Sequence, residues 1–366
     1  MQYMWAKSGA AGDRERVARA GAGLTPLGPS PRIGSGEPDL SHARLDLHTH
    51  TRFSEDRERF TVGGGVTLTV PFHPLLSPLE LYDQALARGM THVTITDHDT
   101  LAGCLDLLAR HPNPDRFITG EEVSCFHRGA CFHVGVYGLS EADHAAIHEG
   151  ADSVDRERRC LRWNVAELTA FLRARGLAFD LKHPLWVHGE GSTALAALRE
   201  VVPLFDLFEA RNATRHRWLN DLGVEVIDRW RPGAGYTGGS DSHSANQGIT
   251  WTETEGTTSE EVLASLRAGR ATAGGEHGTH ARLEDDFRRM FRANAIDRAG
   301  TFKALADDYW HNMPLVSQDL LALSVSASLA YAAVNEYARQ RRLAREVRAA
   351  LADELGAPAE VADGAA

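Results

Sequence analysis

Cysteine and long apolar runs are both scarce in this sequence, and each shortage limits what the protein can be. The four cysteines form no Cys-x-x-Cys pair, and we interpret them as reduced thiols that act as small buried hydrophobic side chains: Cys104, Cys125, Cys131 and Cys160. No run of about 18 apolar residues is present to cross a bilayer, and the N-terminus lacks the charged-then-apolar pattern of a secretion signal. The sequence therefore predicts a cytoplasmic protein without membrane association.

Positive charge is the next shortage. The chain has 39 Lys and Arg residues against 50 Asp and Glu residues, which gives a net charge of -11. Because nonspecific affinity for nucleic acid comes from basic side chains that neutralise phosphates, we expect no stable binding of duplex nucleic acid. A small anionic substrate remains compatible with this balance if bound metal ions make the site locally positive.

Length and composition favour one large domain with appendages, because 366 residues, 43% of them hydrophobic, can bury a full core. Residues 1–42 are predicted to be a disordered leader, since residues 21–38 are dense in Gly, Pro and Ser. Residues 43–281 carry the patterned strands and helices. Residues 282–366 are rich in Ala, Arg and Leu and predict a helical C-terminal extension, which packs on the domain or on a partner and is compatible with a homo-oligomer.

The first strongly patterned strand, residues 44–50, ends in two histidines. Side chains alternate faces along a strand, so His48 and His50 share one face with Asp46, while Leu45 and Leu47 point the other way. An isolated His-x-His is more often a pair of surface histidines than a metal site. The metal interpretation is favoured here because later segments also run from an apolar strand into a His or Asp.

Strand, loop and helix segments alternate along the chain, which predicts an α/β fold with a mainly parallel sheet. Strands are expected at residues 44–50, 92–96, 117–118, 130–137, 177–181, 205–210 and 224–227. Helices are expected at residues 77–89, 101–110, 155–175, 193–201, 214–222 and 259–268. Most metal-competent residues follow a strand's carboxyl end, where a (β/α) barrel has its active site. An open doubly wound sheet is the alternative, but no Gly-x-Gly-x-x-Gly turn follows the first strand.

The candidate metal ligands are imidazoles and carboxylates, which suit Zn²⁺, Mn²⁺ or iron, with Mg²⁺ also compatible. They are His48, His50, Asp56 (or Glu55), His98, Glu122, His133, His183, Asp241 and His243. Nine ligands exceed what one ion needs. We therefore expect two or three divalent ions, with Glu122 as the bridging carboxylate.

Five motifs, in this order, resemble those of the PHP (polymerase and histidinol phosphatase) family. They are Asp-Leu-His-Thr-His-Thr, Thr-Asp-His-Asp-Thr, Gly-Glu-Glu-Val-Ser, Lys-His-Pro and Gly-Gly-Ser-Asp-Ser-His, spread over residues 44–280. The resemblance implies a distorted seven-stranded, TIM-like (β/α) barrel with a two- or three-metal site that hydrolyses phosphoesters. It also implies ligand roles for the eight matching positions: His48, His50, His98, Glu122, His133, His183, Asp241 and His243.

The chain departs from the family pattern in two places. The family often has Ser-Asp-Gly after the first motif, whereas here Ser54 is followed by Glu55 and Asp56, of which we favour Asp56 as ligand. A Gly-rich insertion at residues 62–71 also lengthens the loop beside the site.

Roles beyond metal binding are assigned to a few further residues. Asp97, Glu122 and Asp241 are the candidate catalytic carboxylates. Asp97 either accepts a hydrogen bond from His98 or caps a helix, a role for which Asp99 is the stronger candidate. Lys182 and Arg211 are candidates for binding the substrate phosphate, with solvated surface charge as the alternative for each.

The chemistry expected is attack by a metal-activated water on a phosphate ester. The predicted function is a metal-dependent phosphoesterase acting on a small phosphorylated molecule or nucleotide. A 3'/5' exonuclease on short oligonucleotides is the alternative within this class. Outside it stand an amidohydrolase, which usually needs a bridging lysine, and a non-catalytic binding protein.

Overall fold

A computed structural model describes most of the domain and part of the C-terminal segment. The described residues are 42–54, 56–62, 66–72, 74–111, 116–149, 163–187, 191–297 and 318–355. Of the predicted leader only His42 is described, as the first residue of a strand, and the rest lies outside these ranges. Among the described helices, none is both long and apolar enough to span a membrane.

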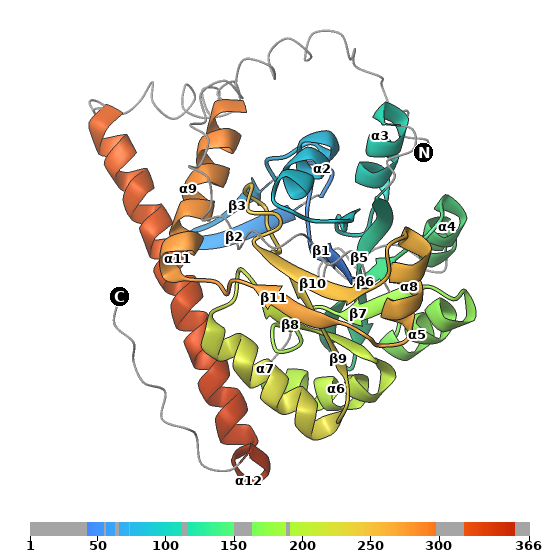
Figure 1. The fold of residues 1–366 in the computed structure, drawn as a ribbon. Coiled ribbons are helices and arrows are strands. Elements are labelled where there is room, and N and C mark those ends of the chain that lie inside the picture. The colour runs from blue at the N-terminus through green and yellow to red at the C-terminus, as the bar shows by residue number, and fades with distance from the viewer. Residues whose placement is uncertain are drawn as a thin grey trace, which may run out of the picture.

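A curled sheet of six strands, in the order β4-β5-β6-β7-β8-β9, forms the middle of the molecule (Figure 1). The strands are β4 (Val93–Ile95), β5 (Phe117–His127), β6 (Ala130–Tyr137), β7 (Ala178–Leu181), β8 (Leu207–Asn212) and β9 (Gly235–Gly239). The pairs β4–β5, β7–β8 and β8–β9 are parallel, whereas β6 is antiparallel to both of its neighbours. The α/β prediction is confirmed, with one antiparallel strand in an otherwise parallel sheet.

The first predicted strand does not join this sheet, so the seven-stranded barrel is not formed. Strand β1 (His42–Leu45) pairs instead with β10 (Thr250–Glu255), which pairs with β11 (Thr272–Gly275). The residues after β1 lie between the two edges of the six-stranded sheet: Thr96 N donates to Thr49 O on one side, and Asp241 N donates to His48 O on the other. Each is an isolated backbone hydrogen bond and not part of a continuous strand ladder. One reason is that the backbone N–H of His48 donates to the Asp46 carboxylate instead of to a neighbouring strand.

Outside residues 63–65, which are not described, the Gly-rich insertion lies in the paired strands of a β-hairpin rather than in a loop. Strand β2 (Asp56–Val62) pairs antiparallel with β3 (Val66–Phe72) over its full length. The hairpin lies beside helix α9 in Figure 1, and β3 contacts that helix.

Helices cover the sheet, and some of them begin with the expected side-chain caps. They are α2 (Pro78–Ala87), α3 (Ala102–Arg110), α4 (Glu141–Glu149), α5 (Val165–Ala174), α6 (Gly191–Val201), α7 (Arg217–Trp230) and α8 (Ser259–Arg267), with a 3-10 turn η2 (Val202–Leu204). The predicted capping box of α2 is confirmed: the Ser77 side chain accepts from Glu80 N, and the Glu80 carboxylate accepts from Ser77 N. Asp99, by contrast, caps no helix, since α3 begins without a side-chain cap.

The strand predicted at residues 224–227 is wrong. Helix α7 runs through this segment and buries Leu219, Leu222, Val226 and Ile227. These residues recur at helical spacing, and Gly223 lies within the helix rather than ending it. A short apolar run beside a glycine is ambiguous between strand and helix when the sequence alone is read.

The described parts of residues 282–366 are helical, as predicted. They form α9 (His280–Asp297), the long α11 (Gln318–Ala350) and the short α12 (Ala352–Leu355). Helix α11 runs along one side of the molecule, against α9 and α7 (Figure 1). The C-terminal segment therefore packs on the domain of its own chain.

The main hydrophobic core lies between the sheet and its helices. It joins buried side chains from separate elements, among them Leu81, Ile95, Val134, Leu168 and Phe208. Cys104 and Cys125 are buried free thiols, as predicted. The prediction is wrong for Cys131, which is disulfide-bonded; Cys160 lies outside the described residues.

Candidate metal centre

Eight of the nine predicted ligands converge at one end of the six-stranded sheet. Their ligand atoms form overlapping groups of three in which all atoms lie within 4.8 Å of one another. The eight are His48, His50, His98, Glu122, His133, His183, Asp241 and His243. The ninth, Asp56, begins β2, and its side chain is outside the described part of the structure, so its ligand role stays a prediction.

Glu122 occupies the middle of this cluster. Its Oε2 lies 3.0 Å from His48 Nε2 and 3.1 Å from His98 Nδ1. Its Oε1 lies 2.9 Å from His133 Nδ1 and 3.4 Å from His183 Nε2. The two oxygens therefore face different histidines, which is the arrangement of a carboxylate shared between ions.

Asp241 supplies a second carboxylate from the loop after β9. Its Oδ1 lies 3.5 Å from Nε2 of both His48 and His50. Its Oδ2 accepts hydrogen bonds from Asn212 and Thr214, which fix the orientation of the carboxylate. Asp241 and His183 both have a positive φ, 49° and 25°, so the backbone holds two site residues in the left-handed region that side chains usually avoid.

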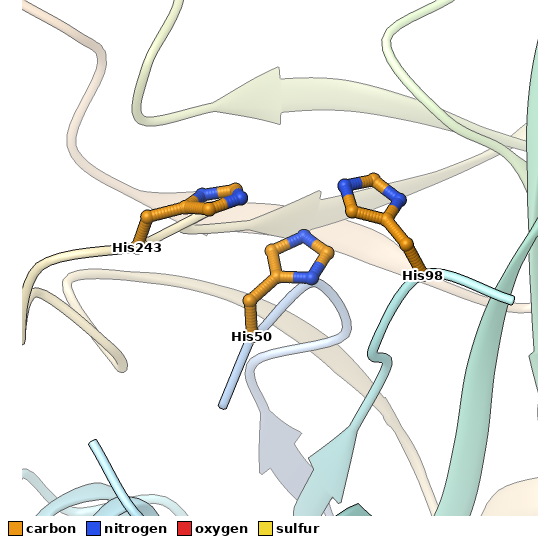
Figure 2. A group of neighbouring side chains, drawn as sticks. All are labelled: His50, His98 and His243. Atoms are coloured by element: carbon orange, nitrogen blue, oxygen red, sulfur yellow. The ribbon is translucent and has the colours of Figure 1, made fainter. Parts of the chain in front are cut away.

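Three histidines from distant segments meet at one side of the cluster. Figure 2 shows His50 between His98 and His243, with the three rings turned toward one another. The ring centroid of His50 lies 4.5 Å from that of His98 and 4.4 Å from that of His243. Their ligand nitrogens form one of the three-residue groups, so this face offers an all-imidazole position.

The donor set fits divalent metal ions. Neutral imidazoles and carboxylates are the ligands that Zn²⁺, Mn²⁺ and Fe²⁺ share. Within the described residues, Nε2 of His50 and Oε1 of Glu122 are buried and have no hydrogen-bond partner. Buried polar atoms are rarely left in this state, and ligation of an ion satisfies both.

Electrostatics favour the metal-binding form of two of these side chains, Glu122 and His50, whereas at His48 burial is outweighed by Glu122, Glu209 and Asp241, which raise its pKa well above the usual value. Burial disfavours the ionised Glu122, but His48, His98 and His133 outweigh it and hold the pKa of Glu122 well below its usual value. Burial, followed by the neighbouring His243 and His98, lowers the pKa of His50 to about 4, so its imidazole is neutral at pH 7. An anionic carboxylate beside a neutral imidazole is the protonation state that ligation requires.

Glu209 is a functional residue that the sequence did not single out. Its Oε1 lies 2.8 Å from His48 Nδ1, so His48 can use Nε2 toward the cluster. Its Oε2 accepts from the backbone N–H of His183 and from Asn212 Nδ2. Carboxylates behind ligating histidines fix their tautomer and orientation. The one available signal was a glutamate directly after the apolar pair Leu207 and Phe208.

Lys182 lies in neither of the positions expected for it, which were a phosphate-binding position at the site and a solvated position on the surface. It is buried, and its Nζ donates to Leu47 O at 2.9 Å and lies 3.2 Å from Asp180 Oδ2. Tyr137 and Thr237 also donate to Asp180. Lys182 thus belongs to a buried polar network that supports the first motif, and its ammonium group is already engaged away from a substrate.

Asp97 and Arg211 lie next to the site without the predicted contacts. The Asp97 carboxylate accepts from the N–H and the hydroxyl of Thr51, both at 2.6 Å, and so fixes the turn after His50. Burial raises the pKa of Asp97 to about 7. The Arg211 guanidinium donates to Gly275 O at 2.9 Å. Asp99 accepts from Ser124 N, which ties the second motif to β5.

Arg215 is a second residue that the sequence analysis missed. Its Nη2 lies 3.8 Å from Asp241 Oδ2, and its Nη1 lies 3.6 Å from Glu336 Oε1 in α11. The guanidinium stacks over the ring of Trp186, 4.4 Å from the centroid. The positively charged guanidinium of Arg215 therefore lies at the edge of the cluster, in contact with both the domain and helix α11.

Comparison with known proteins adds distant structural similarities only. No protein-family model and no curated protein matches the chain. A protein of Bifidobacterium adolescentis, named provisionally as a metal-dependent phosphoesterase, is 14% identical with a TM-score of 0.40, and the match covers 62% of this chain and 94% of that one. The lesion-specific endonuclease of Pyrococcus furiosus is 14% identical with a TM-score of 0.41, covering 63% of this chain and 57% of that one.

A third solved structure, an amidohydrolase of Chromobacterium violaceum, is 17% identical with a TM-score of 0.39, and the match covers 62% of this chain and 90% of that one. These similarities are too low to carry an argument about this chain. Its function is therefore argued from its own residues.

Proposed function

We propose that this protein is a metal-dependent hydrolase of the PHP type that cleaves a phosphate ester of a small molecule or nucleotide. The observation that carries the proposal is the convergence of six histidines on Glu122 and Asp241. The five motifs that resemble the PHP family supply seven of these eight residues, and the eighth, His133, comes from strand β6.

Two or three divalent ions would be held by the overlapping three-residue groups. One group contains His48, His50 and Glu122, and another contains His98, Glu122 and His133. Bound there, such ions supply Lewis acidity, which brings the pKa of water toward neutrality and offsets the charge of a phosphate. Because Glu122 belongs to both groups, it sets the spacing between the two positions.

The chain's own residues define the rest of the chemistry. Glu209 and Asp97 orient the first motif from behind, so the ligands need little rearrangement. Arg215 offers a guanidinium beside Asp241, and we assign it to the substrate phosphate in place of Lys182. Guanidinium and phosphate match in geometry, since two parallel N–H donors can meet two phosphate oxygens.

Small substrates are favoured over long nucleic acids. The net charge of -11 provides no general attraction for a polyanion. Short oligonucleotides remain the second substrate class, because a terminal phosphodiester needs the same cluster and one cation. We propose neither duplex binding nor a membrane role.

The test is hydrolysis of a chromogenic phosphomonoester and a chromogenic nucleotide phosphodiester, after chelation and re-addition of Mn²⁺, Zn²⁺ or Mg²⁺. We expect metal-restored cleavage, and the preferred substrate separates a phosphatase from a nuclease. Glu122→Gln should be inactive, while Glu200→Gln, which changes an exposed carboxylate paired with His127, should keep full activity.

Failure to cleave either substrate with any metal, in protein shown to be folded and metal-loaded, would contradict the proposal. Cleavage of amide substrates would then identify an amidohydrolase. Metal binding without any hydrolysis would identify a binding protein.

A further inference from the structure

A second group of metal-competent side chains lies outside the main cluster. Glu121 precedes Glu122 in β5, and successive side chains of a strand point to opposite faces, so its carboxylate faces α4 instead. There it meets His144 and His148. We propose that Glu121, His144 and His148 form a separate site for one divalent cation, with Zn²⁺ as the favoured ion.

The three ligand atoms already lie close together. His144 Nδ1 is 2.7 Å from Glu121 Oε2, and His148 Nε2 is 2.6 Å from Glu121 Oε1. The two histidines are four residues apart in α4, so they project from the same face of the helix. Their ring centroids are 4.3 Å apart, and all three ligand atoms fall within 4.8 Å of one another.

Helix α4 is held in place independently of these contacts. At its start, Ser140 N donates to the Asp143 carboxylate and Asp143 N donates to the Ser140 hydroxyl. On its inner face Ile147 is fully buried in the main core. The helix therefore presents both imidazoles to Glu121 from a fixed position, as a preformed site requires.

The burial and chemistry of the three groups favour an ion. The Glu121 carboxylate is fully buried, and the two side chains that meet it are both imidazoles, which together with a carboxylate form a donor set that zinc uses in proteins. A cation held between the three groups would offset the charge of the buried carboxylate. Tetrahedral zinc holds its ligand atoms about 3.4 Å apart, so the two nitrogen–oxygen distances between the histidines and Glu121 need to open by less than about 1 Å.

Solvent can reach the site to deliver an ion and complete its coordination. The side chains of His144 and His148 are 27% and 24% exposed, whereas Glu121 is fully covered. Two histidines, one glutamate and a water form a donor set that zinc uses in proteins. An ion here ties α4 to the strand that carries Glu122, which makes the site a structural support for the main cluster.

The test counts bound zinc. Protein stripped by chelation is titrated with Zn²⁺ alone, desalted and measured by mass spectrometry, and its melting temperature is followed in parallel. We expect the His144→Ala/His148→Ala double variant to bind one Zn²⁺ fewer than the wild type and to gain less thermal stability from zinc. His127→Ala is the matched control, because His127 contacts the single carboxylate Glu200 at 3.0 Å, and it should match the wild type.

A converse experiment keeps the test decisive if the double variant does not fold. The His50→Ala/Glu122→Ala/Asp241→Ala variant, which removes a ligand from every three-residue group of the main cluster, should retain one Zn²⁺ and lose it when His148→Ala is added. Equal zinc counts in the α4 double variant and the wild type, or a main-cluster variant that retains no zinc, would overturn the proposal. Neither readout depends on hydrolysis, so failure of the proposed function leaves the result unaffected.

Discussion

The surroundings of one side chain, the Glu122 carboxylate, favour the binding of cations in the cluster. The carboxylate is fully buried, and five histidine nitrogens lie within 3.4 Å of its two oxygens. A carboxylate offers about four acceptor sites, so hydrogen bonds to it cannot satisfy all five of these nitrogens. Metal ions held by these side chains would satisfy both kinds of atom, including the unpaired Nε2 of His50 and Oε1 of Glu122.

The first prediction concerns two ligands on irregular segments. Asp241→Ala and His50→Ala should each lose bound metal and activity together, while the fold persists, because neither side chain belongs to the hydrophobic core. Metal content, kcat/KM and circular dichroism measure the three effects. Full activity in either variant would remove that residue from the site.

The second prediction concerns Glu209, which touches His48 from behind. Glu209→Gln should weaken metal affinity by about 10- to 100-fold, since the amide holds the His48 tautomer less firmly than the carboxylate does. Excess metal should restore activity, which separates this positioning role from loss of a ligand. Competition with a chromogenic chelator measures the affinity, with Glu200→Gln as the control; an unchanged affinity contradicts the assignment.

Within single elements, two glycines should respond to alanine in opposite ways. In β9 a Cβ on Gly239 would lie 2.2 Å from His48 Cβ, so Gly239→Ala should displace the first motif and reduce metal binding. In α7 a Cβ on Gly223 would meet Leu185 at an ordinary 3.9 Å. Gly223→Ala should therefore stabilise the protein, by about 0.5–1 kcal/mol from helix propensity.

Urea denaturation measures both changes, and metal titration follows the first. A stabilised Gly239→Ala with normal metal affinity would show that the close approach of β9 to His48 is not required.

His216, at the start of α7, links the stability of this region to pH. Its ring stacks on Trp218 and meets Tyr337 of α11 edge-on at 4.8 Å. Burial, together with the nearby His280 and Arg341, lowers the pKa of His216 to about 4. Because the unfolded chain has a histidine pKa near 6.5 and binds the proton first, stability is full above about pH 6.5 and decreases as the pH falls toward 4.

We expect the melting temperature to fall over this window and the His216→Gln variant to show a smaller fall. Calorimetry on chelated protein at several pH values measures both. Identical slopes for the variant and the wild type would assign the pH dependence to other groups.

At the scale of the whole molecule, α11 joins the C-terminal segment to the site. Gln340 is fully buried; its Oε1 accepts from His216 N, and its Nε2 donates to Thr214 O. Between these two residues stands Arg215, which also contacts Glu336 of the same helix. The helix therefore fixes the segment that carries the proposed phosphate-binding cation.

Gln340→Ala should lower stability by about 1–3 kcal/mol, since it leaves a buried N–H and C=O without partners. It should also raise KM more than it lowers kcat, because Arg215 loses its fixed position while the metal ligands stay in place. Steady-state kinetics and denaturation measure these effects, with the exposed Asn335→Ala as control. Unchanged KM would separate α11 from substrate binding.

The sequence by itself determined which side chains are candidate metal ligands, and it determined most of the elements. Of the nine predicted ligands, the eight that lie together in the structure follow or interrupt apolar strands, and local patterns such as the Ser77–Glu80 capping box are properties of neighbouring residues. The resemblance of five ordered motifs also indicated that these segments share one site.

Other features were decided only by tertiary structure, because they depend on residues far apart in the chain. Pairing of β1 with β10, 209 residues away at Arg44 and Glu253, removed the seventh strand from the main sheet. Lys182 is buried beside Asp180, which engages its ammonium group. Glu209 lies next to His48, and α11 lies next to Arg215, so long-range contacts gave roles to two residues that the sequence analysis had not singled out. Local sequence specifies which side chains can bind a metal, whereas long-range packing specifies which charges remain available beside it.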